Sequence, residues 1–102
     1  MFTVKGLYEV GTIESTLLGF EDHGIFIAQI CFDLGGSGQC IQACLDPSTT
    51  DGFIKRILWA VDVNTWEELV GKQARIYRDE PYQKIVAISS INGTNYYRWG
   101  TK

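Results

Sequence analysis

The feature that most constrains the fold is an alternation of apolar and polar residues between Ile25 and Leu34. The even positions are all apolar: Phe26, Ala28, Ile30, Phe32 and Leu34. The odd positions include Gln29, Cys31 and Asp33. A period of two gives a β-strand one apolar and one polar face. The pattern therefore predicts a strand with one buried side.

A second strand is predicted directly after this one, in the segment Gln39 to Asp46. The loop Gly35-Gly36-Ser37-Gly38 separates the two segments. If the loop closes a hairpin that pairs Leu34 with Gln39, the apolar residues of both strands share one face. These residues of the second strand are Ile41, Ala43 and Leu45, whereas Cys40, Gln42, Cys44 and Asp46 join the polar face. Agreement between the two patterns supports a hairpin.

The rest of the chain predicts one main helix and further strands. An apolar helical stripe follows the breaker Asp46–Thr50, and Trp59 falls almost opposite its centre. The stripe is formed by Phe53, Ile54, Ile57, Leu58 and Val61. Asn64 and Glu67 suggest a capping box for a short helix over Thr65–Leu69, which Gly71 ends. The predicted strands are Thr12–Phe20, Gln73–Asp79, Lys84–Ile91 and a short Thr94–Trp99, with turns at His23-Gly24, around Glu80-Pro81-Tyr82 and at Asn92-Gly93.

This order of elements predicts an α+β fold. We expect a single domain over residues 1–102, in which an antiparallel sheet of about five strands is packed by one main α-helix, with a short second helix. No apolar run approaches the roughly 20 residues that a membrane helix needs, and the first ten residues do not resemble a signal peptide. The three cysteines are an odd number without framework spacing. We therefore expect reduced thiols and a cytoplasmic location.

Charge is unevenly distributed along the chain. The net charge is −3, but residues 1–51 hold seven acidic residues and one lysine, whereas residues 52–102 hold eight basic residues and five acidic ones. The two halves thus carry −6 and +3. Proteins that bind duplex DNA usually carry a strong basic surface. A duplex nucleic-acid partner is therefore not expected, although the basic half suits a small anionic ligand or an acidic protein.

No catalytic or metal-binding constellation stands out. His23 is the only histidine, and the string Glu21-Asp22-His23-Gly24 is typical of a turn. No serine lies in a nucleophile elbow. Structural zinc needs four ligands, usually in closely spaced pairs, so buried or interface thiols are the simpler interpretation of Cys31, Cys40 and Cys44. The chain is predicted to be a binding protein without cofactor, metal or enzymatic activity.

Two groups of residues are candidates for binding. The loop Gly35, Gly36, Ser37 and Gly38 is either a flexible hairpin turn or a loop whose backbone N–H groups approach a phosphate. The second group combines aromatic and basic side chains: Arg56, Trp59, Arg75, Arg78, Tyr96, Tyr97, Arg98 and Trp99. Aromatic rings stack on bases and arginine binds phosphates, but subunit interfaces also favour these residue types. A ligand pocket, a subunit interface and ordinary surface all stay open.

Five strings in the sequence resemble small proteins that phages and prophages encode, a family of mostly unknown function. They begin at Leu18 (LGFEDHGI), Gly35 (GGSGQ), Leu45 (LD), Phe53 (FIKRIL) and Val63 (VNTWEELVGK). The resemblance runs from about Thr12 to Ile91. Family members carry a longer glycine-rich stretch before the helix, which Cys40–Asp51 replaces here. The resemblance implies a location in the host cytoplasm and a role in the contest between phage and host.

One class of such phage proteins resembles the sponges that sequester nucleotide immune signals, as in the Thoeris system. We therefore expect a non-enzymatic protein that binds a cyclic or ADP-ribose-type nucleotide, as a homo-oligomer. Two alternatives stay open. One is a protein–protein inhibitor of a host defence complex, similar to anti-CRISPR proteins. The other is an accessory protein of phage nucleic-acid metabolism.

Overall fold

Six strands, one α-helix and one 3-10 turn make up the computed structural model, which describes residues 8–48, 50–80 and 83–99. In chain order they are β1 (Tyr8–Phe20), β2 (Phe26–Asp33), β3 (Gly38–Cys44), α1 (Thr50–Val61), the 3-10 turn η2 (Trp66–Leu69), β4 (Gln73–Tyr77), β5 (Ala87–Ser89) and β6 (Tyr96–Arg98). The predicted α+β class and main helix are confirmed, and the sheet has one strand more than expected.

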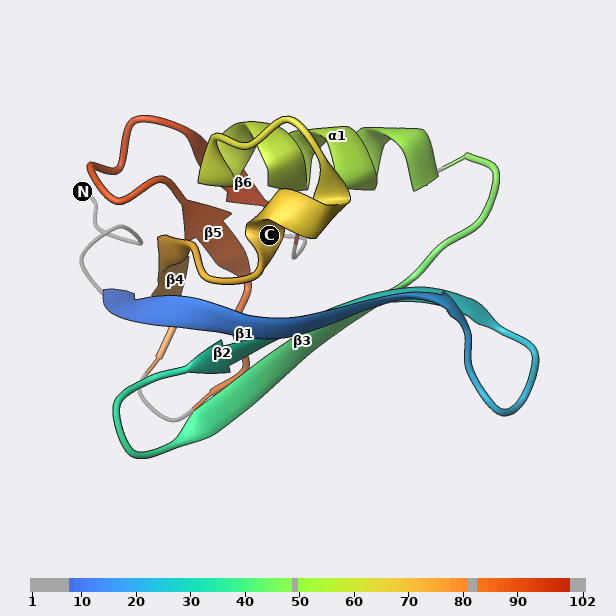
Figure 1. Cartoon of the computed structure of the whole chain (residues 1–102), viewed down its shortest axis with the longest axis horizontal. Helices are drawn as coiled ribbons and strands as arrows, with labels where there is room; N and C mark the ends of the chain where they lie inside the picture. Colours follow the sequence, from blue (N-terminus) through green and yellow to red (C-terminus); the bar gives the residue numbers. More distant parts are fainter. Residues whose placement is uncertain (1–7, 49, 81–82, 100–102) are drawn as a thin grey trace.

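All six strands form one antiparallel sheet in the order β3-β2-β1-β4-β5-β6. Figure 1 shows α1 along one face of this sheet, with the β1–β2 turn projecting beyond the helix. β1 is the longest strand, and it pairs with β4 only over Tyr8–Thr12 and with β2 from Thr12 to Phe20. A bulge between Ile13 and Ser15 separates these two halves. Bulges increase the bend of a strand, so β1 belongs to both halves of a curved sheet.

The β2–β3 hairpin forms, but with a register different from the predicted one. Gln39 lies opposite Phe32, not opposite Leu34. The Leu34 N–H donates a hydrogen bond to the Ser37 carbonyl at 2.8 Å, so Leu34 belongs to the turn. A shift of this size leaves every side chain on its predicted face, which is why the alternation could not reveal it.

The main core lies between α1 and the sheet. From the sheet, Ile13, Ile30 and Phe32 are fully buried, and Ile57 of α1 packs into the same cluster. Burying a side chain of this size contributes roughly 1.5–3 kcal/mol. The predicted apolar faces of β2 and of the helix are both in this core, and Trp59 lies outside it with 52% of its surface exposed.

The sheet curls so that its two ends approach one another. β3 stands at one end of the strand order and β6 at the other. Nevertheless, Arg78, just after β4, donates a hydrogen bond to the Gln39 side chain of β3. A pocket is also lined jointly by β3, by residues that precede β5, and by Trp99 after β6. A groove therefore runs between the outer edge of β3 and the β5–β6 end of the sheet.

Several predicted boundaries need correction. β4 ends at Tyr77 and β5 covers only Ala87–Ser89, because Lys84 to Val86 line a pocket with the middle of β3 and are not part of a regular strand. In the predicted linker Glu80-Pro81-Tyr82, the last two residues lie outside the described residues. The turn at Gly93 is confirmed, with a backbone φ of 81° and its N–H donated to the Ser90 carbonyl.

The short second helix is a 3-10 turn whose capping group is Glu68, not Glu67. The Glu68 carboxylate accepts hydrogen bonds from the backbone N–H groups of Asn64 at 2.8 Å and Thr65 at 3.1 Å. These two bonds lower the pKa of Glu68. The predicted capping box was one residue out of register, because Glu67 and Glu68 are adjacent and have identical side chains.

Two of the three cysteines are bonded to each other, which corrects the expectation of reduced thiols. Cys31 and Cys40 face each other on β2 and β3 and form a disulfide. The predicted register had placed Cys40 opposite Asp33, so it hid this pairing. Cys44 is free and exposed, not buried.

Candidate functional site

The candidate site is a pocket of about 390 Å³ at the first turns of α1. Its walls come from the end of β3, the loop that follows, α1, and the end of the chain around β6. The described residues that line it are Ala43, Cys44, Leu45, Ser48, Gly52, Phe53, Arg56, Tyr97 and Trp99. Its volume is within the range of small-molecule sites, about 300–1,000 Å³.

Local periodicity explains how these side chains meet. Phe53 belongs to the inward-facing stripe of α1, and Arg56 follows three residues later on a neighbouring face of the helix. On β6, alternation turns Tyr97 toward the helix and its neighbours Tyr96 and Arg98 toward the other side of the sheet. Trp99 lies on the same side as Tyr97. The helix and the last strand therefore present two walls of one pocket.

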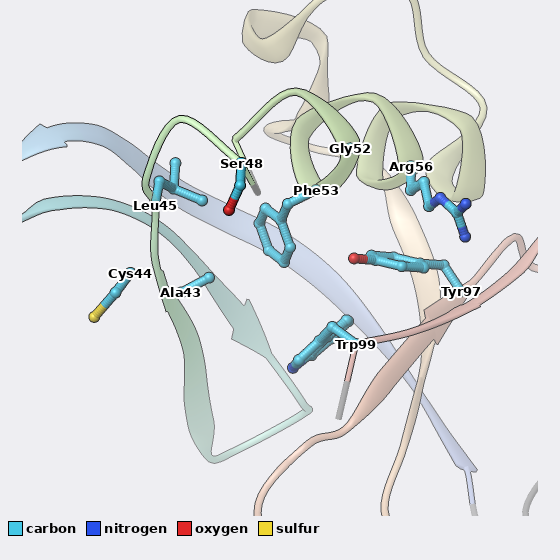
Figure 2. Close-up of a pocket in the computed structure, with 9 residues that line it drawn as sticks. All are labelled: Ala43, Cys44, Leu45, Ser48, Gly52, Phe53, Arg56, Tyr97 and Trp99. Atoms are coloured by element: carbon cyan, nitrogen blue, oxygen red, sulfur yellow. The ribbon is translucent and has the colours of Figure 1, made fainter. Parts of the chain in front are cut away.

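Three aromatic rings form the interior of the pocket. Figure 2 shows Phe53, Tyr97 and Trp99 converging, while the Cys44 thiol points away from them. The ring centroid of Phe53 lies 6.1 Å from that of Tyr97 and 6.1 Å from that of Trp99, with edge-to-face geometry. Tyr97 and Trp99 are 5.9 Å apart. Phe53 is buried, whereas Tyr97 and Trp99 are only partly buried, so a flat apolar group in the pocket can contact these two rings.

Arg56 is the cation of the pocket. Its guanidinium carbon lies 5.7 Å from the centroid of the Tyr97 ring, within the range of a cation–π contact. Among the described residues, no carboxylate pairs with Arg56 and none lines the pocket. Burial raises the pKa of Tyr97, opposed in part by the Arg56 charge, so its hydroxyl is neutral near pH 7. The site therefore has one uncompensated positive charge.

The other predicted site arginines have structural partners. Arg98 makes a bidentate ion pair with Asp79, with N–O distances of 2.8 and 2.9 Å. Arg78 pairs with Glu9 and donates to the Gln83 carbonyl at 2.7 Å. Bidentate pairing and several partners fix these side chains in place.

Arg75 and Tyr96 lie on the face of the sheet opposite α1. Arg75 stacks over the Tyr8 ring, 4.2 Å from its centroid, and Tyr96 packs edge-on against Tyr77 at 4.9 Å. Burial raises the pKa of Tyr96. Tyr96 packs against a second cluster of Tyr77, Val86 and Ala87, and the Tyr8 ring under Arg75 lies 5.7 Å from that of Tyr77. Neither Arg75 nor Tyr96 lines the pocket.

Trp59 and the glycine loop are also separate from the pocket. Trp59 is exposed on the outer side of α1, and the turn between β2 and β3 lies at the opposite end of the hairpin from Ala43 and Cys44. In that turn, Gly35 and Gly36 have φ values of 81° and 108°, which favour glycine, and the Gly35 N–H donates to Asp33 at 3.0 Å. Its glycines are thus explained by the turn itself. Of the predicted group, the structure brings together only Arg56, Tyr97 and Trp99.

Sequence reasoning missed the other walls of the pocket. Phe53 was assigned to the core, and it does pack there, but its ring edge also lines the site. Ser48 and Gly52 carried no chemical signal. The available clue was position: they flank the start of α1, where backbone N–H groups are unpaired and favour negative charge.

A larger pocket, about 560 Å³, lies on another part of the surface near Gly71 and Asn92. No aromatic ring lines it, and Asp62 and Lys72 both do. It lacks a stacking surface, and it is lined by one acidic and one basic described residue, so its lining carries no net charge. Within the described ranges, no three residues among His, Cys, Asp and Glu are grouped so that they could hold a metal ion. No described helix is long and apolar enough to cross a membrane.

Comparisons with known proteins add no assignment. No protein-family model, curated protein or solved structure matches the chain.

Proposed function

We propose that the chain is a non-enzymatic protein that binds and sequesters a small nucleotide, in the role of a phage counter-defence protein. The observation that carries the proposal is the pocket in which Arg56 stands over Tyr97 beside Phe53 and Trp99, with no carboxylate among the described lining residues. The base of a nucleotide is a flat ring that can stack on the aromatic walls. The phosphate of the nucleotide can supply a negatively charged partner for Arg56. The likeness to phage-encoded proteins supports the biological role.

Charge at the pocket supports an anion over a neutral ligand. Gly52 and Phe53 belong to the first turn of α1, so the positive end of the helix dipole lies beside the same pocket as Arg56. Ser48 lies two residues before the helix and donates to the Asp46 carboxylate. The helix dipole and Arg56 both favour a ligand with a phosphate group. A neutral aromatic ligand would use the rings but would leave this charge unpaired.

Titration calorimetry with adenosine 5′-monophosphate and a cyclic adenine nucleotide tests the proposal. We expect 1:1 binding that Trp99→Ala weakens by about 5- to 150-fold, since stacking on an aromatic side chain contributes about 1–3 kcal/mol per base. Trp59→Ala is the matched control, because it removes a tryptophan outside the pocket. Heating the complex should release the nucleotide chemically intact. The proposal would be refuted if neither nucleotide binds, or if the released nucleotide is cleaved.

A second candidate function, binding to a host protein or to another copy of the chain, rests on the β1–β2 hairpin. Six of the nine large apolar residues exposed in the described part of the chain lie between Tyr8 and Ile25, and Phe20 is 73% exposed. Beyond Ile13, the strand pairs with β2 alone, so its other edge is open to another strand. Light scattering of the purified protein and of Phe20→Asp distinguishes an oligomer from a monomer. Loss of a dimer in the variant would assign the hairpin to self-association.

A further inference from the structure

The wall formed by Trp99 is shared by two pockets. The candidate site lies on one side of this side chain, and a smaller pocket of about 250 Å³ lies on the other. The second pocket is lined by Ile41 and Gln42 of β3 and by Lys84 and Ile85 before β5. Trp99 thus separates two compartments that open along the same seam of the curled sheet.

β3 supplies the common floor of both compartments. Residues 40–42 line the smaller pocket, and residues 43–45 line the larger one. A strand rises about 3.3 Å per residue, so these six consecutive residues extend over about 17 Å. β3 is also an edge strand, bonded only to β2, so the seam beside it is not filled by another strand. The two pockets are therefore parts of one elongated groove.

Each compartment has one cation. Lys84 is exposed at the smaller pocket, as Arg56 is at the larger one. Neither forms an ion pair with a described carboxylate, and no described aspartate or glutamate lines either compartment. In contrast, Arg78 and Arg98 each have a carboxylate partner. Within the described ranges, the groove thus presents two positive charges without a carboxylate partner, on the two sides of a tryptophan ring.

Building on the proposed function, we infer that this groove binds a dinucleotide in preference to a mononucleotide. One phosphate lies at Arg56, a base stacks on Trp99, and the second phosphate lies at Lys84. A mononucleotide satisfies only one of the two cations. A ligand with two adjacent phosphates would place both phosphate charges on the same side of the Trp99 ring, so it could pair with only one of the two cations. Two phosphates separated by a nucleoside match the order of cation, ring and cation.

Calorimetry with two probes, adenosine 5′-monophosphate and the 5′-phosphorylated dinucleotide pApA, tests the inference. We expect pApA to bind 1:1 and at least about tenfold more tightly than the mononucleotide, because a second charge-assisted contact is made. Lys84→Ala should weaken pApA binding at least about fivefold and should weaken mononucleotide binding less. Lys72→Ala, a lysine at the separate polar pocket, should change neither.

The outcomes separate this inference from the proposed function. Equal affinities for the two probes, no effect of Lys84→Ala, or two mononucleotides bound per chain would overturn the dinucleotide assignment while the nucleotide site stands. Failure of both probes to bind would overturn both. Lys84 is exposed, so its substitution is not expected to affect folding, and an unchanged melting temperature of the free variant verifies this.

Discussion

Arg56 and Arg75 both lie over a tyrosine ring, on opposite faces of the sheet, but only one of them is available to a ligand. The Arg75 guanidinium is 4.2 Å from the Tyr8 centroid, and its buried Nε has no hydrogen-bond partner among the described residues. Arg56 is exposed, lies 5.7 Å from the Tyr97 centroid, and faces a pocket. The same cation–π contact serves packing in the first case and leaves a free charge in the second.

The surroundings of each tyrosine explain this difference. Around Arg75, the turn at Gly93 closes so tightly that a Cβ atom there would lie 2.6 Å from Nη1. Around Arg56, the curled sheet leaves the seam beside β3 open. Residue type therefore does not separate a structural arginine from a binding arginine in this chain. The space around the guanidinium does.

The largest expected effect contrasts the tyrosines of the two faces. Tyr77 is fully buried, and its hydroxyl lies 2.9 Å from Ser89 Oγ, whereas Tyr97 is only partly buried. We expect Tyr77→Ala to lower the free energy of unfolding by about 3–5 kcal/mol, as for other buried aromatic residues. Tyr97→Ala should cost less than half as much and should weaken nucleotide binding. Urea unfolding of both variants measures this, and equal destabilisation would mean that Tyr97 is a core residue and not a binding residue.

A smaller effect concerns the tightness of the Gly93 turn. Gly93 has a φ of 81° and Gly24 a φ of 83°, but only at Gly93 would a Cβ meet a neighbour within 4 Å. An alanine in this left-handed region costs about 1–2 kcal/mol at either position. Contact with Arg75 should add about 1 kcal/mol at Gly93. Gly24→Ala is thus the matched control in thermal unfolding. Equal losses in the two variants would show that Arg75 moves aside freely, and the enclosed environment argued above would be wrong.

How far the sequence predicts this molecule depends on whether a feature repeats along the chain. Alternation in β2 and β3 and the apolar stripe containing Ile57 identified the elements and their buried faces. Apolar residues recur there at every second position in a strand, or every third to fourth position in a helix, so many residues support the same prediction. The register of the hairpin did not follow. A shift of two residues keeps all faces intact, and the disulfide between Cys31 and Cys40 depends on that register.

The site was less predictable than the fold because it depends on closure of the sheet. Arg56, Tyr97 and Trp99 were identified as binding residue types, but so were Arg75, Arg78 and Arg98, which the structure assigns to packing and ion pairs. The carboxylate partners of the latter two are Glu9 and Asp79, and Glu9 is 69 residues away from Arg78 in sequence. Only the fold brings such partners together, so composition alone overestimated the number of free cations.

The smallest expected effect concerns the ion pair of Arg98, which distinguishes it from Arg56. The hydrogen bond from Arg98 is the main cause that lowers the pKa of Asp79, and the Arg98 pKa is raised in return. Because the folded-state pKa of Asp79 lies below its unfolded value of about 4, the pair stabilises the fold above that pH. This contribution disappears as the pH falls through the folded-state pKa.

Asp79→Asn should therefore lower the melting temperature slightly at pH 7, and the difference from the unsubstituted chain should narrow below about pH 4. The pair is partly exposed, with 43% of the Asp79 side chain accessible, so solvent screening keeps the effect small. The double variant with Arg98→Met should lose less than the sum of the two single variants, because both remove the same ion pair, although Arg98→Met also removes a hydrogen bond to Tyr96. A gap that does not narrow at all between pH 7 and pH 3 would show that side-chain packing stabilises this end of the sheet. In that case the ion pair with Asp79 would no longer distinguish Arg98 from Arg56.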